Sequence, residues 1–405
     1  MKRFPKNILP VLLGGDLNAY SVALAFREAY GVKSHAFVRY RCGATENSSF
    51  IKTRVCTQLT EVKAAVAVLL KFAAENTGAE LFLIPCSDPY VELLQEIKEH
   101  LSSLYRIDVP GTDLWRKLSD KDTFYGLIGK EGISYPEYVA FSSKKEINEK
   151  MLKAIEYPAV LKPTDSAEYW RNPFSDMHKV YFPENAESAR EITEQIFESG
   201  YRKKVILQRK IGNRDGNRVL TAYSDKHGKV VRAVLGEVVL EECGKTSYGN
   251  HTAIITRPLD KISFELIDFL NRIGYTGFSN FDIMADGKEK YVLEINTRQG
   301  RSCDYLRAAG VNIAELIVKN ALSETLIPDF SYKEIYWHYP SHKTVMKYSS
   351  ESVRKEIDRL YNSGMGYTPY ANGYDGARRR IYAAIHNRRL SKAIAKSMRD
   401  LREKN

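Results

Sequence analysis

The sequence predicts an α/β plus α+β protein: a parallel sheet in the N-terminal part, an antiparallel sheet in the middle part, and a basic helical extension at the C-terminal end. Strand and helix patterns alternate in the first third, whereas strand patterns dominate residues 218–257. At about 100–200 residues per domain, a chain of 405 residues forms about two to four domains. We expect the parts 1–115, 116–327 and 328–405.

The N-terminal part begins with a short apolar run, residues 8–13, that ends at Gly14-Gly15-Asp16. Helix patterns follow at 18–30, 62–74 and 88–104, and strand patterns at 35–40 and 81–85. Ligands of such sheets bind beyond the carboxyl ends of the strands. The candidate substrate residues in these loops are Gly14, Gly15, Asp16 and Asp88. Ordinary turn chemistry at strand ends explains the same residues equally well.

The middle part alternates less regularly. A polar loop at 164–178 follows a short strand that ends in Lys162-Pro163. The pattern then predicts strands at 179–182 and 205–209, helices at 186–199 and 262–273, and a hairpin of strands 277–284 and 291–296 that turns at Asp286-Gly287.

The hairpin carries the most informative residues, Asp282, Glu294 and Asn296. Glu294 and Asn296 are two apart on one strand and share a face, and antiparallel pairing can bring Asp282 opposite Glu294. Such hard oxygen ligands suit Mg²⁺, which also takes phosphates and water. Three solvated polar residues on an exposed face are the alternative, but the flanking apolar positions argue against it.

Basic residues surround this cluster in the sequence. Arg298 and Arg301 follow the hairpin, and guanidinium groups beside a metal suit the charge that develops on a transferring phosphoryl group. Lys162 at a strand end suits a phosphate contact. Either arginine could instead form a surface ion pair. No Ser–His–Asp or Cys–His arrangement is visible, and we interpret His178 and His251 as polar loop residues.

Five motifs in the same order resemble the ATP-grasp superfamily: Lys121, Lys162 in Ala-Val-Leu-Lys-Pro, Gln208 in Val-Ile-Leu-Gln, Asp282, and Glu294-Ile-Asn296-x-Arg298. Within it the chain is most similar to the carboxylate–amine ligases, and among these to the D-aspartate ligases of peptidoglycan cross-bridge synthesis. The resemblance to that last group rests on residues 10–20, 162–169, 275–282 and 296–302. It covers residues 8–326 and implies an ATP-grasp fold behind an N-terminal parallel-sheet domain.

The resemblance implies a role for each matching residue. Lys121 and Lys162 would bind ATP phosphates, while Asp282, Glu294 and Asn296 would hold two Mg²⁺ ions. The linker Gln208, Arg209, Lys210 and Ile211 would meet adenine, and the loop 164–178 would cover the triphosphate. Arg298, Arg301 and Arg218 would serve the acyl phosphate. Gly14, Gly15, Asp16, Asn18 and Asp88 would face the substrates.

Two features depart from the family pattern. An acidic or aromatic residue usually follows the linker glutamine, but Arg209 and Lys210 stand there, so Asp215 is our candidate for the ribose carboxylate. The loop 164–178 also lacks the glycine cluster that many relatives have.

Composition narrows the class of protein. No apolar run approaches the ~20 residues of a membrane span, and the five scattered cysteines contain no CxxC pair, which favours a reducing compartment. We expect a cytoplasmic protein. Of the net charge of +11, residues 378–405 carry +8, which leaves +3 (11 − 8) for the remainder. We therefore expect no nucleic-acid partner.

The predicted function is ATP-dependent amide formation through an acyl phosphate, joining D-aspartate to an amine of a peptidoglycan precursor. Two alternatives stay open: an ATP-grasp ligase for another amino acid or a dipeptide, and a non-catalytic nucleotide-binding protein at a membrane surface. Residues 376–404 have a ragged apolar stripe beside basic residues. This helix either contacts an anionic partner at the inner membrane face or docks on the body of the protein.

Overall fold

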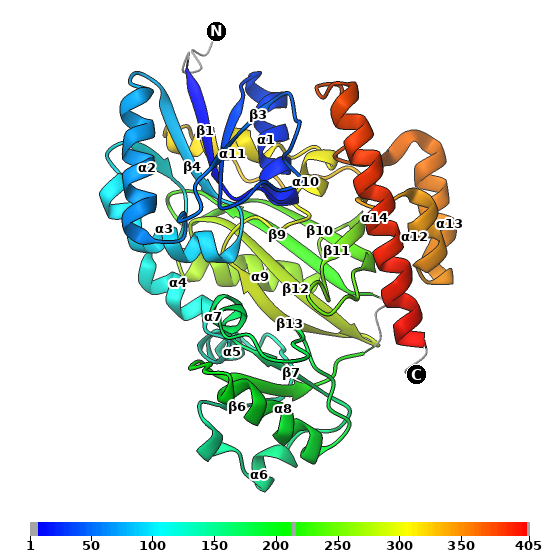
Figure 1. Cartoon of the computed structure of the whole chain (residues 1–405). Helices are drawn as coiled ribbons and strands as arrows, with labels where there is room; N and C mark the ends of the chain where they lie inside the picture. The colour runs from blue at the N-terminus through cyan, green and yellow to red at the C-terminus, as the bar shows by residue number, and fades with distance from the viewer. Residues whose placement is uncertain (1–6, 213–215, 403–405) are drawn as a thin grey trace.

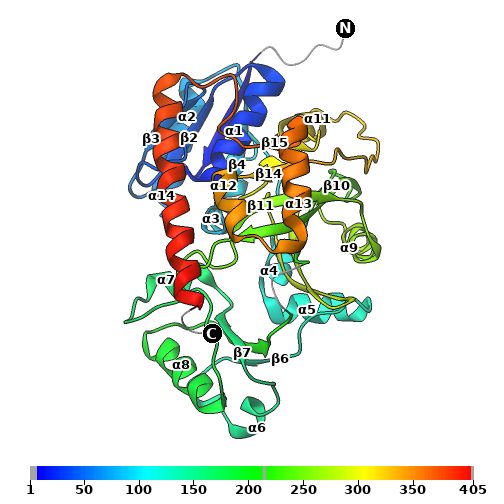
Figure 2. The ribbon, with the colours of Figure 1, turned by 90° about the vertical axis from the view of Figure 1, so that its right-hand side faces the viewer.

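The structure is a computed structural model that describes residues 7–212 and 216–402. It contains three β-sheets, which follow one another from top to bottom in Figure 1: a five-stranded sheet, a seven-stranded sheet and a three-stranded sheet. The long helix α14 (Ala377–Arg402) runs along one side of the molecule, from the five-stranded sheet toward the three-stranded sheet (Figure 2).

The five-stranded sheet is parallel, with the order β3-β2-β1-β4-β5. Its strands are β1 (Ile8–Leu13), β2 (Ser34–Val38), β3 (Ile51–Val55), β4 (Glu80–Pro85) and β5 (Tyr105–Ile107), and its helices are α1 (Leu17–Tyr30), α2 (Val62–Glu75) and α3 (Asp88–Leu101). The sheet and its three helices were predicted, which confirms the parallel α/β part.

The sequence analysis missed β3 and β5, which are the two edge strands of this sheet. Lys52 and Arg54 on β3 have largely solvent-exposed side chains, and β5 has three residues. Neither strand therefore has the continuous apolar run that marks a strand buried on both faces.

The three-stranded sheet is antiparallel, with the order β6-β8-β7. Its elements are β6 (Tyr138–Phe141), η1 (Lys144–Glu146), α6 (Glu149–Leu152), β7 (Ala159–Pro163), α7 (Ser166–Arg171), α8 (Ala186–Glu198) and β8 (Val205–Arg209). The predicted strand at 179–182 is wrong, because only Tyr181 forms a bridge, to Leu161. The predicted loop 164–178 contains the short helix α7, which begins where the Asp165 side chain accepts a hydrogen bond from the backbone N–H of Glu168.

The seven-stranded sheet has the order β13-β12-β9-β10-β11-β14-β15. Its strands are β9 (Arg218–Ser224), β10 (Val230–Glu241), β11 (His251–Arg257), β12 (Gly277–Asp286), β13 (Glu289–Asn296), β14 (Tyr336–His338) and β15 (Gly366–Tyr367). Five of these strands form the predicted antiparallel sheet of the middle part.

Each face of this sheet packs against different elements. One face forms a core with α5 (Lys121–Lys130) and α9 (Lys261–Arg272), next to α4 (Thr112–Ser119). The other face forms a core with α1, α10 (Asp304–Ala308) and α11 (Ile313–Ala321). The second core joins the sheet to the N-terminal parallel sheet, so functional residues on this face lie where the two parts meet.

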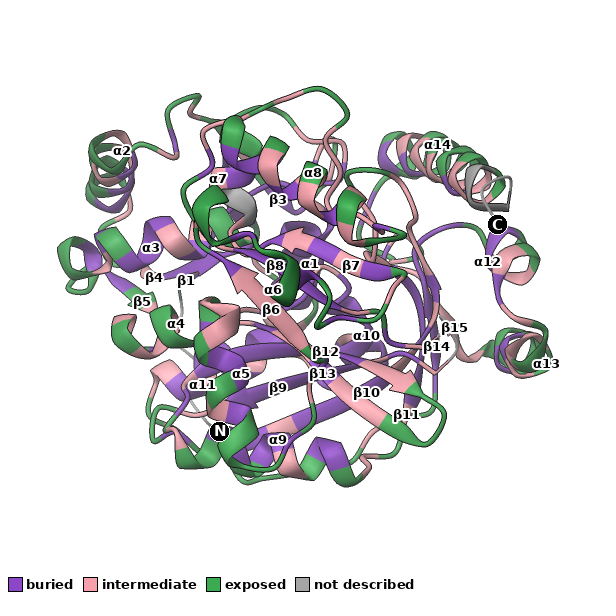
Figure 3. Cartoon of the chain, turned by 90° about the horizontal axis from the view of Figure 1, so that it is seen from below, coloured by how far each residue is buried: buried purple, intermediate pink, exposed green. Residues whose placement is uncertain are grey.

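The C-terminal segment contributes to the body of the protein. Its strand β14 pairs with β11, and α12 (His342–Tyr348), α13 (Glu351–Leu360), η2 (Tyr361–Met365) and β15 follow. Helix α14 was predicted at nearly the same residues. Ala383 and Ile394 of α14 are buried, whereas Ile381 and Ile385 are exposed, so one side of the helix docks on the body (Figure 3). Among the described residues, no helix is both long and apolar enough to cross a membrane.

Candidate active site

The predicted acidic cluster lies on the hairpin of β12 and β13. Asp282 stands directly opposite Glu294, and Asn280 stands opposite Asn296. A bulge next to Asp282 shifts the register by one residue, so that Val292 turns to the apolar face while Glu294 stays on the polar face. The structure thus bears out the predicted geometry, in which two carboxylates and one amide share a face.

Two lysines approach this cluster from other elements. The ammonium group of Lys121, the first residue of α5, forms an ion pair with Glu294, and Lys162 on β7 lies near both. Burial alone would raise the pKa of Glu294, but Lys121 and Lys162 outweigh it and hold the pKa well below its usual range. Burial and the neighbouring Lys121 lower the pKa of Lys162 to about 8. The predicted phosphate ligands and the predicted metal ligands therefore lie together.

His251, which we interpreted as a polar loop residue, is instead the first residue of β11 and lies beside the acidic cluster. Its Nε2 lies 4.0 Å from Oδ1 of Asp282 and 3.9 Å from Oε1 of Glu241. Burial raises the pKa of Asp282 to about 6, and the nearby His251 limits that rise. The contact between His251 and Glu241 arises because these two residues pair across β10 and β11. A single histidine at the start of a strand offers no sequence signal for it.

The predicted linker lies at the end of β8, in the three-stranded sheet. Gln208 is buried, and its Oε1 has no hydrogen-bond partner among the described residues. Ile211 is also buried, whereas the ribose candidate Asp215 lies outside the described residues. A buried amide oxygen without a partner is costly unless a ligand or water bonds to it. Gln208 therefore fits a binding site for a polar ring.

The side chains of Arg209 and Lys210 already have partners. Nη1 of Arg209 lies 3.4 Å from Oδ2 of Asp286, and its guanidinium lies 5.0 Å from the ring centroid of Tyr291. The ammonium of Lys210 lies 5.9 Å from the ring centroid of Phe182. These two linker positions can thus offer a ligand their backbone groups while their side chains contact neighbouring elements.

The loop after α7 crosses to the loop between β10 and β11. The backbone N–H of Lys179 donates to the carbonyl of Lys245 at 2.8 Å, and its ammonium donates to the carbonyl of Tyr248 at 3.0 Å. The positive charge of Lys179 also acts on Asp282 and Glu294. The loop 164–178, which we predicted as a triphosphate cover, ends directly before Lys179 and is therefore tied down close to the carboxylates.

Arg298 joins the acidic cluster to the N-terminal part. Its guanidinium makes two hydrogen bonds to the carboxylate of Asp88, at 2.7 and 2.6 Å, and its Nη2 lies 3.5 Å from Oδ1 of Asn296. Asp88 begins α3, directly after the end of β4. Two candidates that are far apart in the sequence thus form one bidentate pair.

Arg301 forms a second pair. Its Nη1 donates to Oε1 of Glu242 at 2.6 Å, and its charge acts on Asp16 at the start of α1. Asp16 also accepts a hydrogen bond from the backbone N–H of Ala19 as the N-cap of this helix. Burial raises the pKa of Asp16 in spite of these partners.

The structure corrects the prediction for Arg218. Arg218 pairs across the sheet with Ile283, whose side chain faces the core on the other side from Asp282. Its Nη1 lies 3.4 Å from Oε1 of Glu237. Because strand residues alternate between faces, Arg218 lies on the other face of the sheet from Asp282, which stands opposite Val219.

The glycines and Asn18 shape the loop after β1. Gly14 has a φ of +121°, and a Cβ on Gly15 would lie 2.8 Å from Cγ1 of Val38, so both positions require glycine. Asn18 is fully buried, and its amide donates to the carbonyls of Cys86 and Gln299, each at 3.0 Å. Asn18 therefore holds the loops together instead of facing a substrate, which corrects its prediction.

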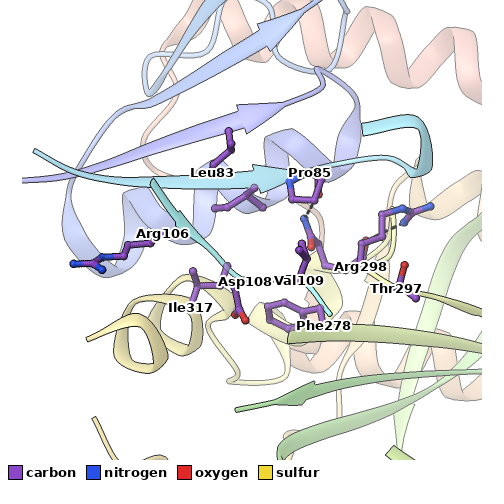
Figure 4. A pocket seen from close by; sticks show the side chains of 11 residues that line it. Leu83, Pro85, Arg106, Asp108, Val109, Phe278, Thr297, Arg298 and Ile317 are labelled. Carbon is purple, nitrogen blue, oxygen red and sulfur yellow. Dashed lines mark hydrogen bonds between the residues drawn. The ribbon is translucent and has the colours of Figure 1, made fainter. Parts of the chain in front are cut away.

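A narrow pocket lies behind Arg298, between the parallel sheet and β12 (Figure 4). It is lined by Leu83, Ile84, Pro85, Arg106, Asp108, Val109, Phe278, Thr297, Arg298, Gln299 and Ile317. Asp108 accepts a hydrogen bond from the hydroxyl of Tyr223, and burial raises its pKa to about 6. Of the candidate site residues, Arg298 lines this pocket, but Lys121, Lys162 and the acidic cluster do not, so we assign the pocket a packing role.

Comparison with known proteins agrees with this geometry. No protein-family model matches the chain. The chain is similar to a D-aspartate ligase of Enterococcus faecium, with 29% identity over 366 residues, which are 87% of each chain. Its fold is similar to the biotin carboxylase domain of Hydrogenobacter thermophilus 2-oxoglutarate carboxylase, with a TM-score of 0.61, 16% identity, and coverage of 81% of this chain and 73% of that chain.

The chain has the ATP-grasp fold. An L-amino acid ligase of Bacillus licheniformis has the same fold, with a TM-score of 0.56, 15% identity, and coverage of 79% of this chain and 75% of that chain. The Hydrogenobacter domain was solved in complex with MgADP.

The residues of this site fit both a nucleotide and Mg²⁺. Asp282, Glu294 and Asn296 supply the hard oxygens that Mg²⁺ prefers. Among the described residues, no cluster of three or more His, Cys, Asp or Glu side chains could hold a metal ion. A metal at this site would therefore complete its coordination with Asn296, water and phosphate oxygens, as is usual for Mg²⁺. Lys121 and Lys162 supply matching positive charge, and Gln208 supplies the unpartnered amide oxygen.

Proposed function

We propose that the protein joins D-aspartate to an amine on the stem peptide of a peptidoglycan precursor. The observation that carries the proposal is the similarity to a D-aspartate ligase over 87% of both chains. The site supports it, because Arg298 lies between the metal ligand Asn296 and Asp88 of the parallel sheet. A carboxylate substrate can thus meet the phosphoryl group at Arg298.

We assign a role to each cluster of this site. Lys121 and Lys162 bind the phosphates of ATP, and the linker 208–211 binds its adenine. Asp282, Glu294 and Asn296 hold two Mg²⁺ ions, which neutralise phosphate charge when bound. Lys179 holds the loop over the triphosphate through its bond to the carbonyl of Tyr248.

The reaction proceeds in two steps. An oxygen of the substrate carboxylate forms a bond to the γ-phosphorus while the bond to the β–γ bridging oxygen breaks, which gives an acyl phosphate and ADP. The amine then bonds to the acyl carbon, phosphate leaves with the C–O electrons, and the nitrogen loses a proton to solvent or phosphate. Arg298 stabilises the charge on the transferring group and on the acyl phosphate.

The test is ADP release with a panel of D- and L-amino acids, with and without a muramyl pentapeptide precursor. We expect release that depends on both D-aspartate and the precursor. D-aspartate labelled with ¹⁸O in its carboxylates should transfer label to phosphate. A preference for another amino acid would support the alternative ligase, and release of AMP with pyrophosphate would exclude the acyl-phosphate route.

We further propose that the outer face of α14 contacts the anionic inner face of the cytoplasmic membrane, where the lipid-linked precursor lies. The exposed charged side chains of this helix are all basic among those described: Arg378, Arg380, Arg388, Arg389, Lys392, Lys396 and Arg399. The apolar side chains of Ile381 and Ile385 are 64% and 49% exposed beside them. Each basic residue near an anionic surface contributes about 1 kcal/mol.

Charge reversal tests this contact without removing the buried side of the helix. The triple variant Arg388→Glu, Lys392→Glu and Lys396→Glu should lose binding to phosphatidylcholine vesicles that contain phosphatidylglycerol. A control triple variant at exposed positions elsewhere is Lys63→Glu, Lys71→Glu and Lys130→Glu. Equal vesicle binding by both variants would exclude a specific role for α14. The division into parts 1–115, 116–327 and 328–405 stays a proposal that limited proteolysis can test.

A further inference from the structure

Arg298 and Arg301, the two arginines after β13, contact different parts of the site. Arg298 interacts with Asp282 and Asn296, beside the metal ligands and Lys121. The groups that act most on Arg301 are Glu242, Tyr339 and Asp16. Arg301 is therefore directed toward the loop after β1 and the C-terminal segment.

The C-terminal segment builds the support for Arg301. The guanidinium of Arg301 lies 5.7 Å from the ring centroid of Tyr339, which directly follows β14. The hydroxyl of Tyr370 donates to the hydroxyl of Tyr339 at 2.9 Å. The Tyr339 hydroxyl is also hydrogen-bonded to Nε2 of His386 on α14, at 2.8 Å. Burial and nearby arginines lower the pKa of His386, which favours the neutral imidazole.

This support is anchored in the N-terminal part. Arg379 is 1% exposed and donates to the carbonyls of Gly43, Ala44 and Glu46 in the loop after β2. Its guanidinium also lies 5.0 Å from the ring centroid of Tyr370. The contacts that lead from α14 through Tyr339 to Arg301 are thus fixed at both ends, and the residues after 328 form the wall behind Arg301.

Asp16 supplies an anionic group near this wall. Among the described residues it forms no ion pair within 4.0 Å, although Arg298 and Arg301 both act on it. Both arginines have closer acidic partners, Asp88 and Glu242. Arg301 uses one N–H on Glu242, and a guanidinium has five donors. The site therefore offers one cation with spare donors and one carboxylate without an ionic partner.

We infer that Arg301 binds the carboxylate of D-aspartate that is not phosphorylated, and that Asp16 binds the ammonium group of the same molecule. The inference rests on the proposed function. D-aspartate has two carboxylates and one ammonium group. With the reacting carboxylate at Arg298, the two groups that remain require one cation and one anion. Tyr339 and His386 are positioning residues that act through Arg301.

Substrate analogues test the assignment of Arg301. β-Alanine lacks the α-carboxylate of D-aspartate, and D-asparagine lacks the β-carboxylate. Whichever carboxylate reacts, one of these two analogues keeps it and lacks only the carboxylate that we assign to Arg301. The wild-type protein should use that analogue about 10- to 100-fold less efficiently than D-aspartate, as expected for a lost charge-assisted contact. Arg301→Gln should raise KM for D-aspartate by a similar factor, leave KM for ATP unchanged, and abolish the preference over the analogue.

A matched control is Arg272→Gln, which removes an arginine that is also 2.6 Å from a glutamate, but on α9. This variant should retain the preference. If Arg301→Gln also retains it while D-aspartate remains a substrate, the inference is wrong and the proposed function survives. If D-aspartate does not support ADP release by the wild-type protein, both are wrong.

Variants of His386 test the positioning chain. His386→Leu removes the hydrogen-bond partner of the Tyr339 hydroxyl and should raise KM for D-aspartate several-fold, with no change in KM for ATP or in Tm. His386→Gln supplies an amide, which can donate or accept, and should restore the lower KM. Equal effects of both substitutions, or an equal rise in KM for ATP, would show that His386 has only a structural role and would overturn this part of the inference.

Discussion

ATP binding should be accompanied by proton uptake at Lys162. In the free protein, burial and the neighbouring Lys121 lower the pKa of Lys162 to about 8 from its usual 10.5. A phosphate group beside the ammonium favours the charged form, so bound ATP should return Lys162 to full protonation. The perturbations that expose this effect are a change of pH and the substitution Lys162→Met.

The size of the proton uptake follows from the pKa of Lys162. With a pKa of about 8, Lys162 is about half protonated at about pH 8 and about one-tenth protonated at about pH 9. ATP binding should therefore take up about 0.5 proton at the lower pH and about 0.9 at the higher pH. The affinity for ATP should fall about fivefold between these two values. Asp282, with a pKa of about 6, is already ionised there and does not contribute.

The lowered pKa of Lys162 also predicts how the stability of the ATP-free protein depends on pH. Below about pH 8 the folded state carries an ammonium that it disfavours, by about 3 kcal/mol for the difference between 10.5 and about 8. Lys162→Met should raise the free energy of unfolding by up to that amount. The gain should fade as the pH rises from about 8 toward 10.5, because wild-type Lys162 then becomes neutral in the folded state first.

Titration calorimetry in two buffers of different ionisation enthalpy measures the proton uptake directly. Lys162→Met should bind ATP more weakly, with no proton uptake and an affinity that does not change with pH. Uptake that is the same in the wild-type protein and in Lys162→Met would refute the reasoning. So would uptake near zero at about pH 9, since this would mean that Lys162 does not contact the phosphates.

Three further predictions follow from single residues. Glu294→Gln should lower kcat by about 100-fold or more while far-UV circular dichroism stays unchanged, and near-normal turnover would contradict the metal-site assignment. The free energy of unfolding of the wild-type protein should fall as the pH rises from about 4 to about 6, because Asp108, whose pKa is about 6, must ionise while buried. Asp108→Asn should remove this fall and raise the free energy of unfolding in urea by up to about 3 kcal/mol near neutral pH. Ile394→Ala, which leaves a cavity under α14, should lower the free energy of unfolding by about 2–4 kcal/mol. Ile385→Ala, at an exposed position, should lower it by less than about 0.5 kcal/mol. Similar losses in the two variants would argue that α14 is not docked.

Most of the fold was predictable because its strands and helices bury strong apolar patterns. Strand β1 and helix α1 are examples, since each lies in the core with few exposed positions. The predicted strand at 179–182 failed for a different reason. Lys179 bonds to the loop at 243–250 instead of to a sheet, and a local pattern holds no information about that partner.

The sequence by itself determined which residues could form the acidic cluster. The spacing of Glu294 and Asn296 places both on one face of a strand, and the apolar positions around them decide which face is polar. It also determined that the last helix has a basic side. These features are local, since they depend only on the period of a strand or a helix.

Only the tertiary structure decided how the remaining residues are used. Strand pairing turned Arg218 away from Asp282 and brought His251 toward it. Packing between segments that are distant in the sequence buried Asn18. It also placed Tyr339 and His386 of the C-terminal segment behind Arg301. These contacts join residues from strands and helices far apart in the chain, and their partners are set by packing between sheets, which no short sequence pattern encodes.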